Sequence, residues 1–456
     1  MTEIKTYIAE NQSRFLDELF RLIRIPSVSP KPENKPYMKE AAEYIADLLL
    51  KAGVDHSCVY ATSGNPVVFG EKTLDATKPT ILVYGHYDVM PAEPLDLWTS
   101  PPFEPEIRDN RIYARGANDD KGQMFMHIKA FEYLVRTKKL NCNVKFMIEG
   151  EEEVGSAGMK EFCINNKKLL SSDIIIVSDT TMATEETPSI TNGLRGICSF
   201  QVEVTGPDRD LHSGHYGGAV MNPVNALAKI ISGLTDNHHK IAIPGFYDDV
   251  EIISDIEREE LKKAPFDIER FKSSIRIPDV YGEKEYAVLE RIGMRPALDV
   301  NGIWGGYSGE GTKTIIPSKA FAKITVRLVP HQDPEIIALL FEKHIKNTAP
   351  PGVKVSVEYL HGGKAYVSPI ESKGFVSAGL AYEKTFGKKP IPIRSGGSIP
   401  IISDFESILG VKSILMGFGL ESDAIHSPNE NFRIDYLHKG IETIIWFYHF
   451  FSGKNS

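Results

Sequence analysis

The sequence predicts an α/β fold in which a mostly parallel sheet flanked by helices is interrupted by an inserted α+β domain. Short runs rich in valine and isoleucine alternate with longer stretches of helical period, which is typical of α/β proteins. Two segments in the middle of the chain, 200–205 and 321–328, alternate apolar and polar residues as half-exposed antiparallel strands do. An apolar run of the first kind returns at 411–416, so the first domain resumes after the second.

The expected elements of the first domain follow one another along the chain. They are helices over 39–52, 121–134, 161–170 and 435–451, and strands over 80–84, 143–148, 173–177 and 411–416. The inserted domain is expected over 193–361, which leaves 1–192 and 362–456 to the first domain. Within the insertion, the stretch 236–296 is rich in charge and weak in periodicity, so no elements are assigned to it.

Composition and charge limit the classes of function. The chain has 456 residues, of which 42% are hydrophobic and 25% charged, as in ordinary globular proteins. It carries 52 basic and 61 acidic side chains, a net charge of −9, which argues against a nucleic-acid partner. No apolar run reaches the roughly 18 residues that a membrane span needs, so no membrane partner is expected.

The expected compartment is the cytoplasm. The start of the chain mixes charged and apolar side chains and lacks the apolar run and cleavage site of a signal peptide. The cysteines, Cys58, Cys142, Cys163 and Cys198, are isolated, which fits reduced thiols better than disulfides or a thiolate metal site.

Candidate metal ligands follow the apolar strands, at the edge where open α/β sheets gather their functional groups. In strand order these groups are His86 with Asp88, the glutamate run that contains Glu152 and Glu153, Asp179, and His426. Asp119 adds a carboxylate just before a helix. Imidazoles and carboxylates without thiolates indicate zinc, manganese or cobalt.

The charge balance favours two metal ions. If Asp119, Glu153 and Asp179 are ligands beside two neutral histidines, three negative charges face one another. Two divalent ions and a bridging hydroxide neutralise them, and a carboxylate between two ions about 3.5 to 4 Å apart is the usual bridge. His86 and Asp88 stand two apart on the expected strand, so Asp88 is expected to orient the His86 ring without binding metal.

Each of these features has a simpler explanation when it is taken alone. A His-Xaa-Asp pair is a weak signal, and a run of glutamates is usually a solvated face. Asp179 fits a turn cap and His426 fits a surface loop. Their coincidence at the ends of the strands is what favours a metal centre.

The motifs around these residues resemble those of the M20 family of metallopeptidases over nearly the whole chain. They are His-Tyr-Asp-Val-Met-Pro at 86–91, Gly-Ala-Asn-Asp-Asp-Lys-Gly at 116–122, Glu-Gly-Glu-Glu-Glu-Val-Gly-Ser at 149–156, Ser-Asp at 178–179, Asp-Leu-His-Ser-Gly at 210–214, and His426. Within the family the chain is most similar to the dipeptidases related to carnosinase and cytosolic nonspecific dipeptidase. That branch is indicated by Leu-His-Ser-Gly-His-Tyr-Gly-Gly at 211–218, Lys-Thr-Ile-Ile-Pro-Ser at 313–318, Ile-Thr-Val-Arg-Leu-Val-Pro at 324–330, His-Gly-Gly at 361–363 and Gly-Gly-Ser-Ile-Pro at 396–400.

The resemblance implies a role for each candidate ligand. Asp119 bridges two divalent ions, His86 and Asp179 complete one site, and Glu153 and His426 complete the other. Zinc is expected first, with manganese or cobalt as alternatives. The peptide bond that follows the bridging aspartate is implied to be cis.

The resemblance also implies the catalytic groups and a homodimer. Glu152 is the general base, which takes a proton from the metal-activated water and returns it to the leaving amine, and Asp88 supports the centre. The inserted domain is a lid that also makes the dimer. His212 comes from the lid of the partner subunit and hydrogen-bonds the developing oxyanion, so each subunit completes the other's site.

Substrate recognition requires a group that binds the free carboxylate of a dipeptide. An arginine fork suits this task, and Arg327 on an expected lid strand is the candidate, although an ordinary surface arginine would fit the same pattern. By resemblance, Thr314, His361 and Ser398 are its neighbours, together with His212.

Several functions remain compatible with these residues. The first is a dinuclear metallodipeptidase that hydrolyses the peptide bond of small dipeptides, and the second is an M20-type N-acyl amino acid deacylase with the same metals and base. A peptide-binding scaffold without activity is disfavoured because Glu152 and all five ligands are present. A two-metal phosphoesterase is disfavoured because the chain has no glycine-rich phosphate loop.

Overall fold

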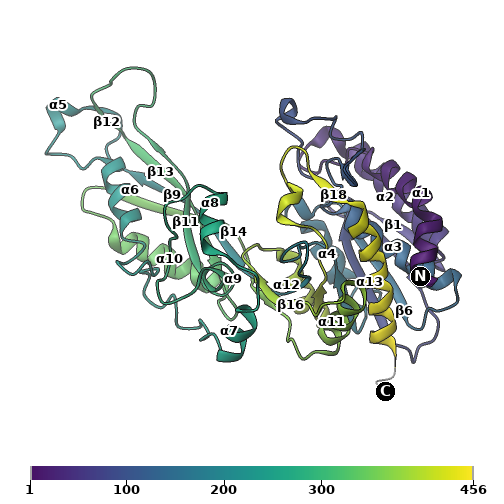
Figure 1. Cartoon of the computed structure of the whole chain (residues 1–456). Helices are drawn as coiled ribbons and strands as arrows, with labels where there is room; N and C mark the ends of the chain where they lie inside the picture. Colours follow the sequence, from purple (N-terminus) through teal and green to yellow (C-terminus); the bar gives the residue numbers. More distant parts are fainter. Residues whose placement is uncertain (1–2, 454–456) are drawn as a thin grey trace.

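The computed structural model describes residues 3–453, which form two parts joined by a few strands (Figure 1). Both ends of the described chain lie in one of them, the main part. The main part has the predicted α/β architecture, a sheet whose central strands are parallel and which helices flank. No helix among residues 3–453 is long and apolar enough to span a bilayer.

Within the described residues, nine strands form the main sheet. In their order across the sheet they are β1 (His56–Tyr60), β2 (Val67–Lys72), β6 (Asn143–Glu149), β3 (Thr80–His86), β7 (Ile174–Val177), β17 (Ser413–Leu415), β8 (Ser189–Leu194) and β15 (Tyr366–Val367), and β16 (Ile391–Ser395) pairs with β8. The four central neighbours β6, β3, β7 and β17 run parallel. Their carboxyl ends therefore meet at one edge of the sheet.

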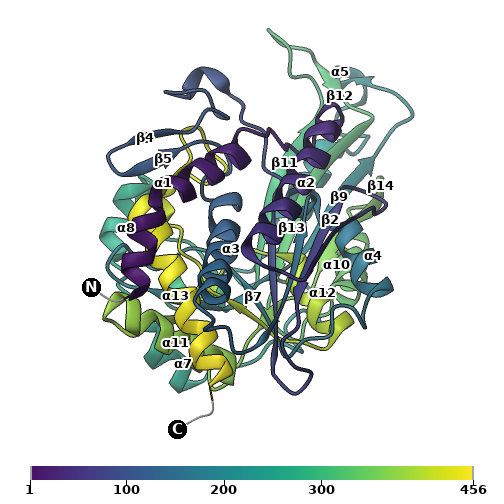
Figure 2. The same ribbon diagram turned by 90° about the vertical axis from the view of Figure 1, so that its right-hand side faces the viewer.

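Helices cover both faces of the main sheet (Figure 2). One face carries α1 (Glu3–Ile23), α2 (Lys35–Ala52), α3 (Lys121–Arg136), α11 (Lys373–Phe386) and α13 (Ile434–Ser452), and the other carries α4 (Ala157–Asn165) and α12 (Pro400–Leu409). In β3, Ile81 and Val83 enter the first core and Leu82 and Tyr84 the second, because successive strand residues point to opposite faces. Burial on both faces explains why the central strands are continuous apolar runs in the sequence.

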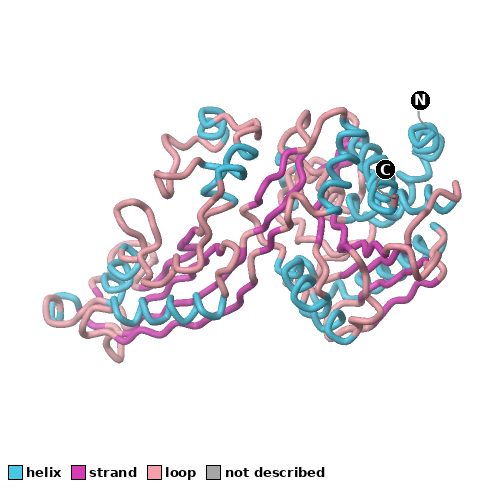
Figure 3. The backbone as a smooth tube through the Cα atoms, turned by 90° about the horizontal axis from the view of Figure 1, so that it is seen from below, coloured by secondary structure: helices cyan, strands magenta, loops and turns pink. Residues whose placement is uncertain are grey.

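The second part is built on an antiparallel sheet of four long strands. They lie in the order β11 (Ala297–Gly305), β13 (Lys319–Leu328), β9 (Gly196–Thr205) and β14 (Lys354–Gly363). Figure 3 shows these strands extending away from the main part. Helices α6 (Pro223–Ser232) and α10 (Pro334–Thr348) cover one face, where Phe200 stacks on Phe341 with ring centroids 4.1 Å apart. The segments 200–205 and 321–328, whose residues alternate between apolar and polar, lie within β9 and β13.

Two small sheets complete the fold. One, in the main part, has the order β18 (Asn431–Arg433), β5 (Arg111–Tyr113) and β4 (Glu106–Arg108). The other pairs β10 (Leu211–His212) with β12 (Ile315–Ile316) and lies with α5 (Ser213–Tyr216) at the outer tip of the second part (Figure 1). The pairing of β18 with β5 brings the segment after β17 against the loop that follows β5.

The chain crosses between the two parts at two adjacent points. β8 ends at Leu194 and β9 begins at Gly196, while β14 ends at Gly363 and β15 begins at Tyr366. At the edge of the main sheet Leu194 pairs with Tyr366 in the β8–β15 ladder. The outgoing and returning segments therefore leave the main sheet side by side.

Two of the differences between the structure and the sequence-based elements concern helices. The helix expected over 161–170 is α4, which begins at Ala157 and ends at Asn165, because consecutive asparagines are poor helix formers and close it. The unassigned stretch 236–296 contains three short helices, α7 (Asp255–Leu261), α8 (Ile268–Ser274) and α9 (Val288–Gly293). They contribute only a small apolar cluster, so the sequence shows no helical period there.

Candidate metal centre

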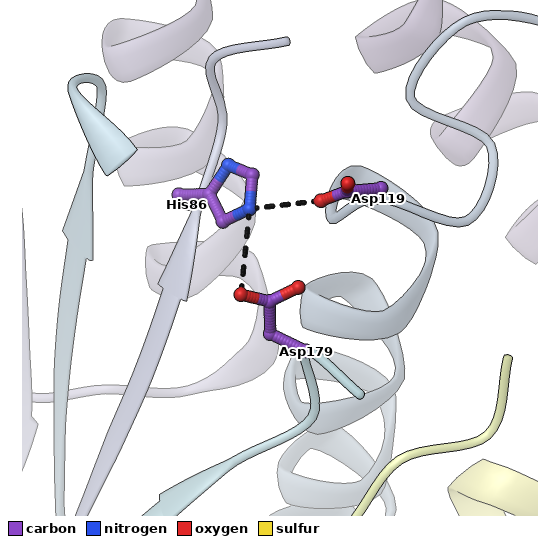
Figure 4. A group of neighbouring side chains, drawn as sticks. All are labelled: His86, Asp119 and Asp179. Carbon is purple, nitrogen blue, oxygen red and sulfur yellow. Dashed lines mark ion pairs between the residues drawn. The ribbon is translucent and has the colours of Figure 1, made fainter. Parts of the chain in front are cut away.

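Three of the candidate ligands converge at the carboxyl edge of the main sheet (Figure 4). β3 ends at His86, Asp179 lies two residues beyond β7, and Asp119 lies two residues before α3. Because β3 and β7 are paired with Tyr84 opposite Val177, the residues that follow them reach the same edge. Nε2 of His86 is 3.1 Å from Oδ1 of Asp119 and 3.8 Å from Oδ2 of Asp179.

The other two candidate ligands, Glu153 and His426, form a second set with Oδ2 of Asp119. Nε2 of His426 is 2.9 Å from Oδ2 of Asp119 and 3.1 Å from Oε2 of Glu153. Each set, His86 with Asp119 and Asp179, and Asp119 with Glu153 and His426, offers three ligand atoms within 4.8 Å of one another. Asp119 is common to both sets and presents a different oxygen to each histidine.

The chemistry of these residues fits divalent ions. Each set combines one imidazole with two carboxylates, the donor mixture that zinc and manganese accept. Oε1 of Glu153 is buried and has no hydrogen-bond partner among the described residues. The peptide bond between Asp119 and Asp120 is cis, as the resemblance implied.

The electrostatic surroundings stabilise positive charge at this point. Hydrogen bonds with Asp119 and Glu153 raise the pKa of His426 to about 10. Burial raises the pKa of Glu153 to about 7 and also raises the pKa of Asp179. Burial alone would lower the pKa of His86, but hydrogen bonds to Asp119 and Asp179 raise it well above its ordinary value. The carboxylates favour protonated imidazoles, that is, positive charge at this site. Bound metal cations would supply that positive charge in place of the protons.

Asp88 connects His86 to the turn that carries the glutamates. Its Oδ1 accepts the backbone N–H of Glu152 at 3.2 Å and lies 3.4 Å from Nδ1 of His86, and its Oδ2 accepts the N–H of Glu153 at 3.2 Å. The carbonyl oxygen of Asp88 also lies 3.0 Å from Nδ1 of His86. The expectation that both residues share a strand is wrong, because β3 ends at His86, and the following loop turns Asp88 toward the ring.

Glu152 begins the 3₁₀ turn η3 (Glu152–Val154), directly before the candidate ligand Glu153. Burial raises the pKa of its carboxyl well above the ordinary value, and the charges of His86 and Asp179 act on it directly. Glu151, one residue earlier, turns away, since its Oε2 accepts the backbone N–H of Gly158 at 2.9 Å. The glutamate run is therefore divided between the centre and the start of α4.

Comparison with known proteins identifies the family of this centre. The model of peptidase family M20/M25/M40 matches residues 82–447, a span that contains all five candidate ligands. The chain belongs to this peptidase family. It is an enzyme with peptidase activity.

Two relatives are similar to this M20 peptidase along almost its whole length. It is 31% identical to the Cys-Gly metallodipeptidase dug1 of Schizosaccharomyces pombe, covering 97% of this chain and 96% of the relative. It is also 31% identical to the beta-Ala-His dipeptidase of Homo sapiens, covering 96% and 90% of the two chains.

Solved structures show the same similarity. The dipeptidase Dug1p of Saccharomyces cerevisiae superposes with a TM-score of 0.84 at 28% identity, covering 99% of this chain and 98% of that chain. The metallo-carboxypeptidase Sso-CP2 of Sulfolobus solfataricus superposes with a TM-score of 0.86 at 34% identity, covering 96% and 99%. Both structures support the mixed α/β fold.

The candidate substrate residues of this M20 peptidase fall into separate groups. Nη1 of Arg327 in β13 donates to Oγ of Ser398 at 2.9 Å, and that hydroxyl donates to the carbonyl oxygen of Arg195. His361 lies on β14 opposite Ser199 of β9. The structure therefore joins Arg327 to Ser398 near the crossing between the two parts.

β10 ends at His212 and pairs with β12, which directly follows Thr314 and lies at the outer tip of the second part (Figure 1). The carbonyl oxygen of Thr314 accepts the backbone N–H of Ser213 at 3.0 Å. Nδ1 of His212 accepts the N–H of Gly214, and its ring stacks on His215 with centroids 4.5 Å apart. Within one chain the structure brings His212 to Thr314 but not to the metal ligands.

The sequence does not predict two carboxylates that lie behind the ligands, Asp423 and Glu430. Oδ2 of Asp423 accepts from Nδ2 of Asn118 at 2.7 Å, and Glu430 accepts backbone N–H groups of the loop that carries Asp119. Both lie in an aperiodic polar stretch, and their partners come from a loop some 300 residues earlier, so the sequence offers no signal for them.

Proposed function

We propose that this M20 peptidase is a dinuclear metal-dependent dipeptidase. His86, Asp119 and Asp179 would hold one divalent ion and Asp119, Glu153 and His426 the other, with zinc first and manganese or cobalt as alternatives. The observation that carries the proposal is the position of Asp119, whose two oxygens each face a different imidazole and carboxylate pair. The dipeptidase names of the two relatives point the same way.

Glu152 is the group that moves protons in this proposal. The metal ions, when bound, lower the pKa of water and polarise the substrate carbonyl. The carboxylate of Glu152 accepts a proton from the attacking water and then donates it to the amine that leaves. Asp88 holds this turn in place, because its carboxylate accepts the backbone N–H groups of both Glu152 and Glu153.

Arg327 would bind the free carboxylate of the dipeptide, with Ser398, Thr314, His361 and His212 completing the substrate site. The Arg327 guanidinium is half buried, and no carboxylate of residues 3–453 forms a direct ion pair with it, although the charge of Asp299 acts on it from a greater distance. A half-buried cation without a directly bound carboxylate is suited to an anionic ligand. Recognition of a terminal carboxylate would place the scissile bond near the C-terminus of the substrate.

We infer that the enzyme acts as a homodimer in which His212 reaches the partner's site. The position of His212 at the outer tip, away from the ligands of its own chain, supports this arrangement. β11 is an edge strand that carries exposed apolar side chains, Ile303 at 54% and Trp304 at 44% exposure. An edge strand with such residues is suited to pairing with a second copy.

The domain division of the proposal remains 1–192 and 362–456 for the catalytic domain and 193–361 for the lid and dimerisation domain. Residues 1–2 and 454–456 at the outer ends of these ranges lie outside the described part of the chain. The cytoplasmic location also remains a prediction; it is supported by cysteines that carry no disulfide.

Hydrolysis of a substrate panel tests the proposed activity. Protein stripped with a chelator is reloaded with zinc, manganese or cobalt and incubated with Cys-Gly, Ala-Ala, β-Ala-His and with N-acetyl and N-succinyl amino acids. We expect metal-dependent cleavage of the free dipeptides only. Cleavage of the acylated compounds alone would instead make the enzyme a deacylase with the same ligands and base. Analytical sedimentation in the same buffers tests separately whether the protein is a dimer.

A further inference from the structure

Glu430 is a buried carboxylate that belongs to neither ligand set. It lies four residues after His426 and directly before β18, and its side chain is fully shielded from solvent. Oε1 accepts the backbone N–H groups of Asn118 at 2.9 Å and Asp119 at 3.1 Å. Oε2 accepts the backbone N–H of Gly116 at 3.0 Å and Nη1 of Arg115 at 2.8 Å.

These four bonds fix the loop that carries the shared ligand. Three of the donors are backbone groups between residues 116 and 119, so their bonds restrict the main chain itself. The carbonyl oxygen of Glu430 adds a further bond, from the backbone N–H of Ala114 at 3.0 Å. Because Arg115 is buried beside it, the charge of Glu430 is compensated without any contact with solvent.

The segment that holds this loop also carries a ligand. His426 lies between Asp423 and Glu430, and Asp423 accepts from the side chain of Asn118 in the same loop. Asp423 is itself held, because its Oδ1 accepts from Nη1 of Arg111 at 2.8 Å. Segment 423–430 thus presents one imidazole to Asp119 and at the same time fixes the backbone from which Asp119 projects.

We propose that Glu430 is a positioning residue of the metal centre. Its carboxylate sets the backbone of loop 114–119 so that the two oxygens of Asp119 face His86 and His426 simultaneously. This inference rests on the proposed dinuclear centre. It adds that metal affinity depends on a carboxylate that does not bind the metal, in the way that groups behind a ligand commonly tune it.

Glu430→Gln tests the inference with little change in side-chain volume. The glutamine amide keeps one oxygen, but its NH₂ group faces either the N–H groups of Asn118 and Asp119 or those of Arg115 and Gly116. Donors then oppose donors, and one half of the loop loses its acceptor.

Glu132→Gln is the matched control. Glu132 is also a buried carboxylate with four hydrogen bonds, from Tyr7, from both terminal nitrogens of Arg14 and from Lys129. It lies on α3, away from the metal ligands, so a general loss of stability appears in both variants and a loss of positioning in only one.

The readout is zinc affinity and stoichiometry, measured by competition with a chromophoric chelator below the melting temperature of every variant. We expect Glu430→Gln to bind zinc about 10- to 100-fold more weakly than wild type, the usual range for a lost partner behind a ligand. Glu132→Gln should bind zinc as wild type does. Zinc affinity of Glu430→Gln equal to that of wild type would overturn the inference, as would an equal loss in both variants.

Two further outcomes are distinguished by the same measurement. If wild type binds no zinc, manganese or cobalt, the proposed centre itself fails, whatever the variants do. If Glu430→Gln does not fold, Asp423→Asn replaces it, because it removes an acceptor for Asn118 in the same loop. A loss of zinc affinity in Asp423→Asn supports the inference, and unchanged affinity overturns it.

Discussion

Replacement of Glu152 by glutamine separates proton transfer from metal binding. The carboxyl of Glu152 lies among the ligands but offers no atom to either ligand set. The backbone N–H that Asp88 accepts remains in the variant, and so do the bonds that close the turn from Glu151 to Val154 and Ser156. The amide has nearly the volume of the acid. The substitution therefore removes a proton acceptor and leaves the surrounding structure intact.

The expected effect lies in kcat. Loss of a general base costs about 10²- to 10⁴-fold, which corresponds to about 2.7 to 5.4 kcal/mol of activation free energy. KM and metal stoichiometry should stay near their wild-type values. The assay is steady-state hydrolysis of the best dipeptide of the panel by the zinc-loaded enzyme, with metal content measured on the same samples.

Glu151→Gln is the control for this experiment. Its carboxylate is bonded to the start of α4 through the N–H of Gly158, so kcat should change little. If Glu151→Gln loses activity and Glu152→Gln keeps it, the assignment of the base is off by one residue. If both keep kcat within tenfold of wild type, neither Glu151 nor Glu152 is the base and the reasoning is refuted.

Four further predictions concern pH, metal, substrate and packing. Burial lowers the pKa of His127 to about 3, so the folded protein binds fewer protons than the unfolded chain between about pH 3 and 6.5, and stability falls as the pH drops through that window. When the pH is lowered from 7.5 to 5.5, the free energy of unfolding of wild type should fall by about 1.4 kcal/mol more than that of His127→Gln. Urea titration measures both free energies, and equal losses would contradict the prediction. Removal of metal should lower the melting temperature, and free zinc at 100 times its Kd should restore about 2.7 kcal/mol; a calorimetric scan that is insensitive to zinc argues against the centre. Arg327→Met should raise KM for free dipeptides about 10- to 100-fold and leave KM for their C-terminal amides unchanged, because only the former present a carboxylate. Gly440→Ala in α13 should cost about 1 to 3 kcal/mol, because its Cβ would lie 2.1 Å from Sδ of Met126. Gly379→Ala in α11, whose Cβ meets nothing closer than 4.0 Å, should stabilise the protein, and thermal melts compare the two.

The parts of the fold that the sequence predicts are those in which one chemical property repeats. The strand at 80–84 is apolar from Ile81 to Tyr84 because both faces of β3 are buried there, and the helix that begins at Lys121 carries recurring apolar residues. β1 and β2 were not predicted, since β1 is an edge strand of mixed, partly exposed residues. The helices of 236–296 are held by caps and ion pairs such as Arg258 with Glu290, which leave no period in the sequence.

The candidate site likewise contains residues that the sequence predicts and residues that it does not. Ligands at the ends of apolar strands, such as His86 and Asp179, are predictable because parallel strands place their carboxyl ends together. His426 follows β17 by eleven residues; the strand pattern made it a candidate ligand, and the family resemblance implied which of the two sites it completes. Glu430 was not predicted because its partners are backbone N–H groups, which every non-proline residue carries and no motif distinguishes.

The adjacent crossing points between the two parts make the whole second part, in topological terms, the loop of a β-hairpin. Its two stems are β8 and β15, which remain hydrogen-bonded to each other whatever lies between them. Joining Leu194 to Tyr366 through a short turn would therefore close the main sheet without moving a strand, and all five candidate ligands lie outside the excised stretch. The second part is thus a cassette set into a continuous host sheet, and the candidate ligands of the metal centre all belong to the host.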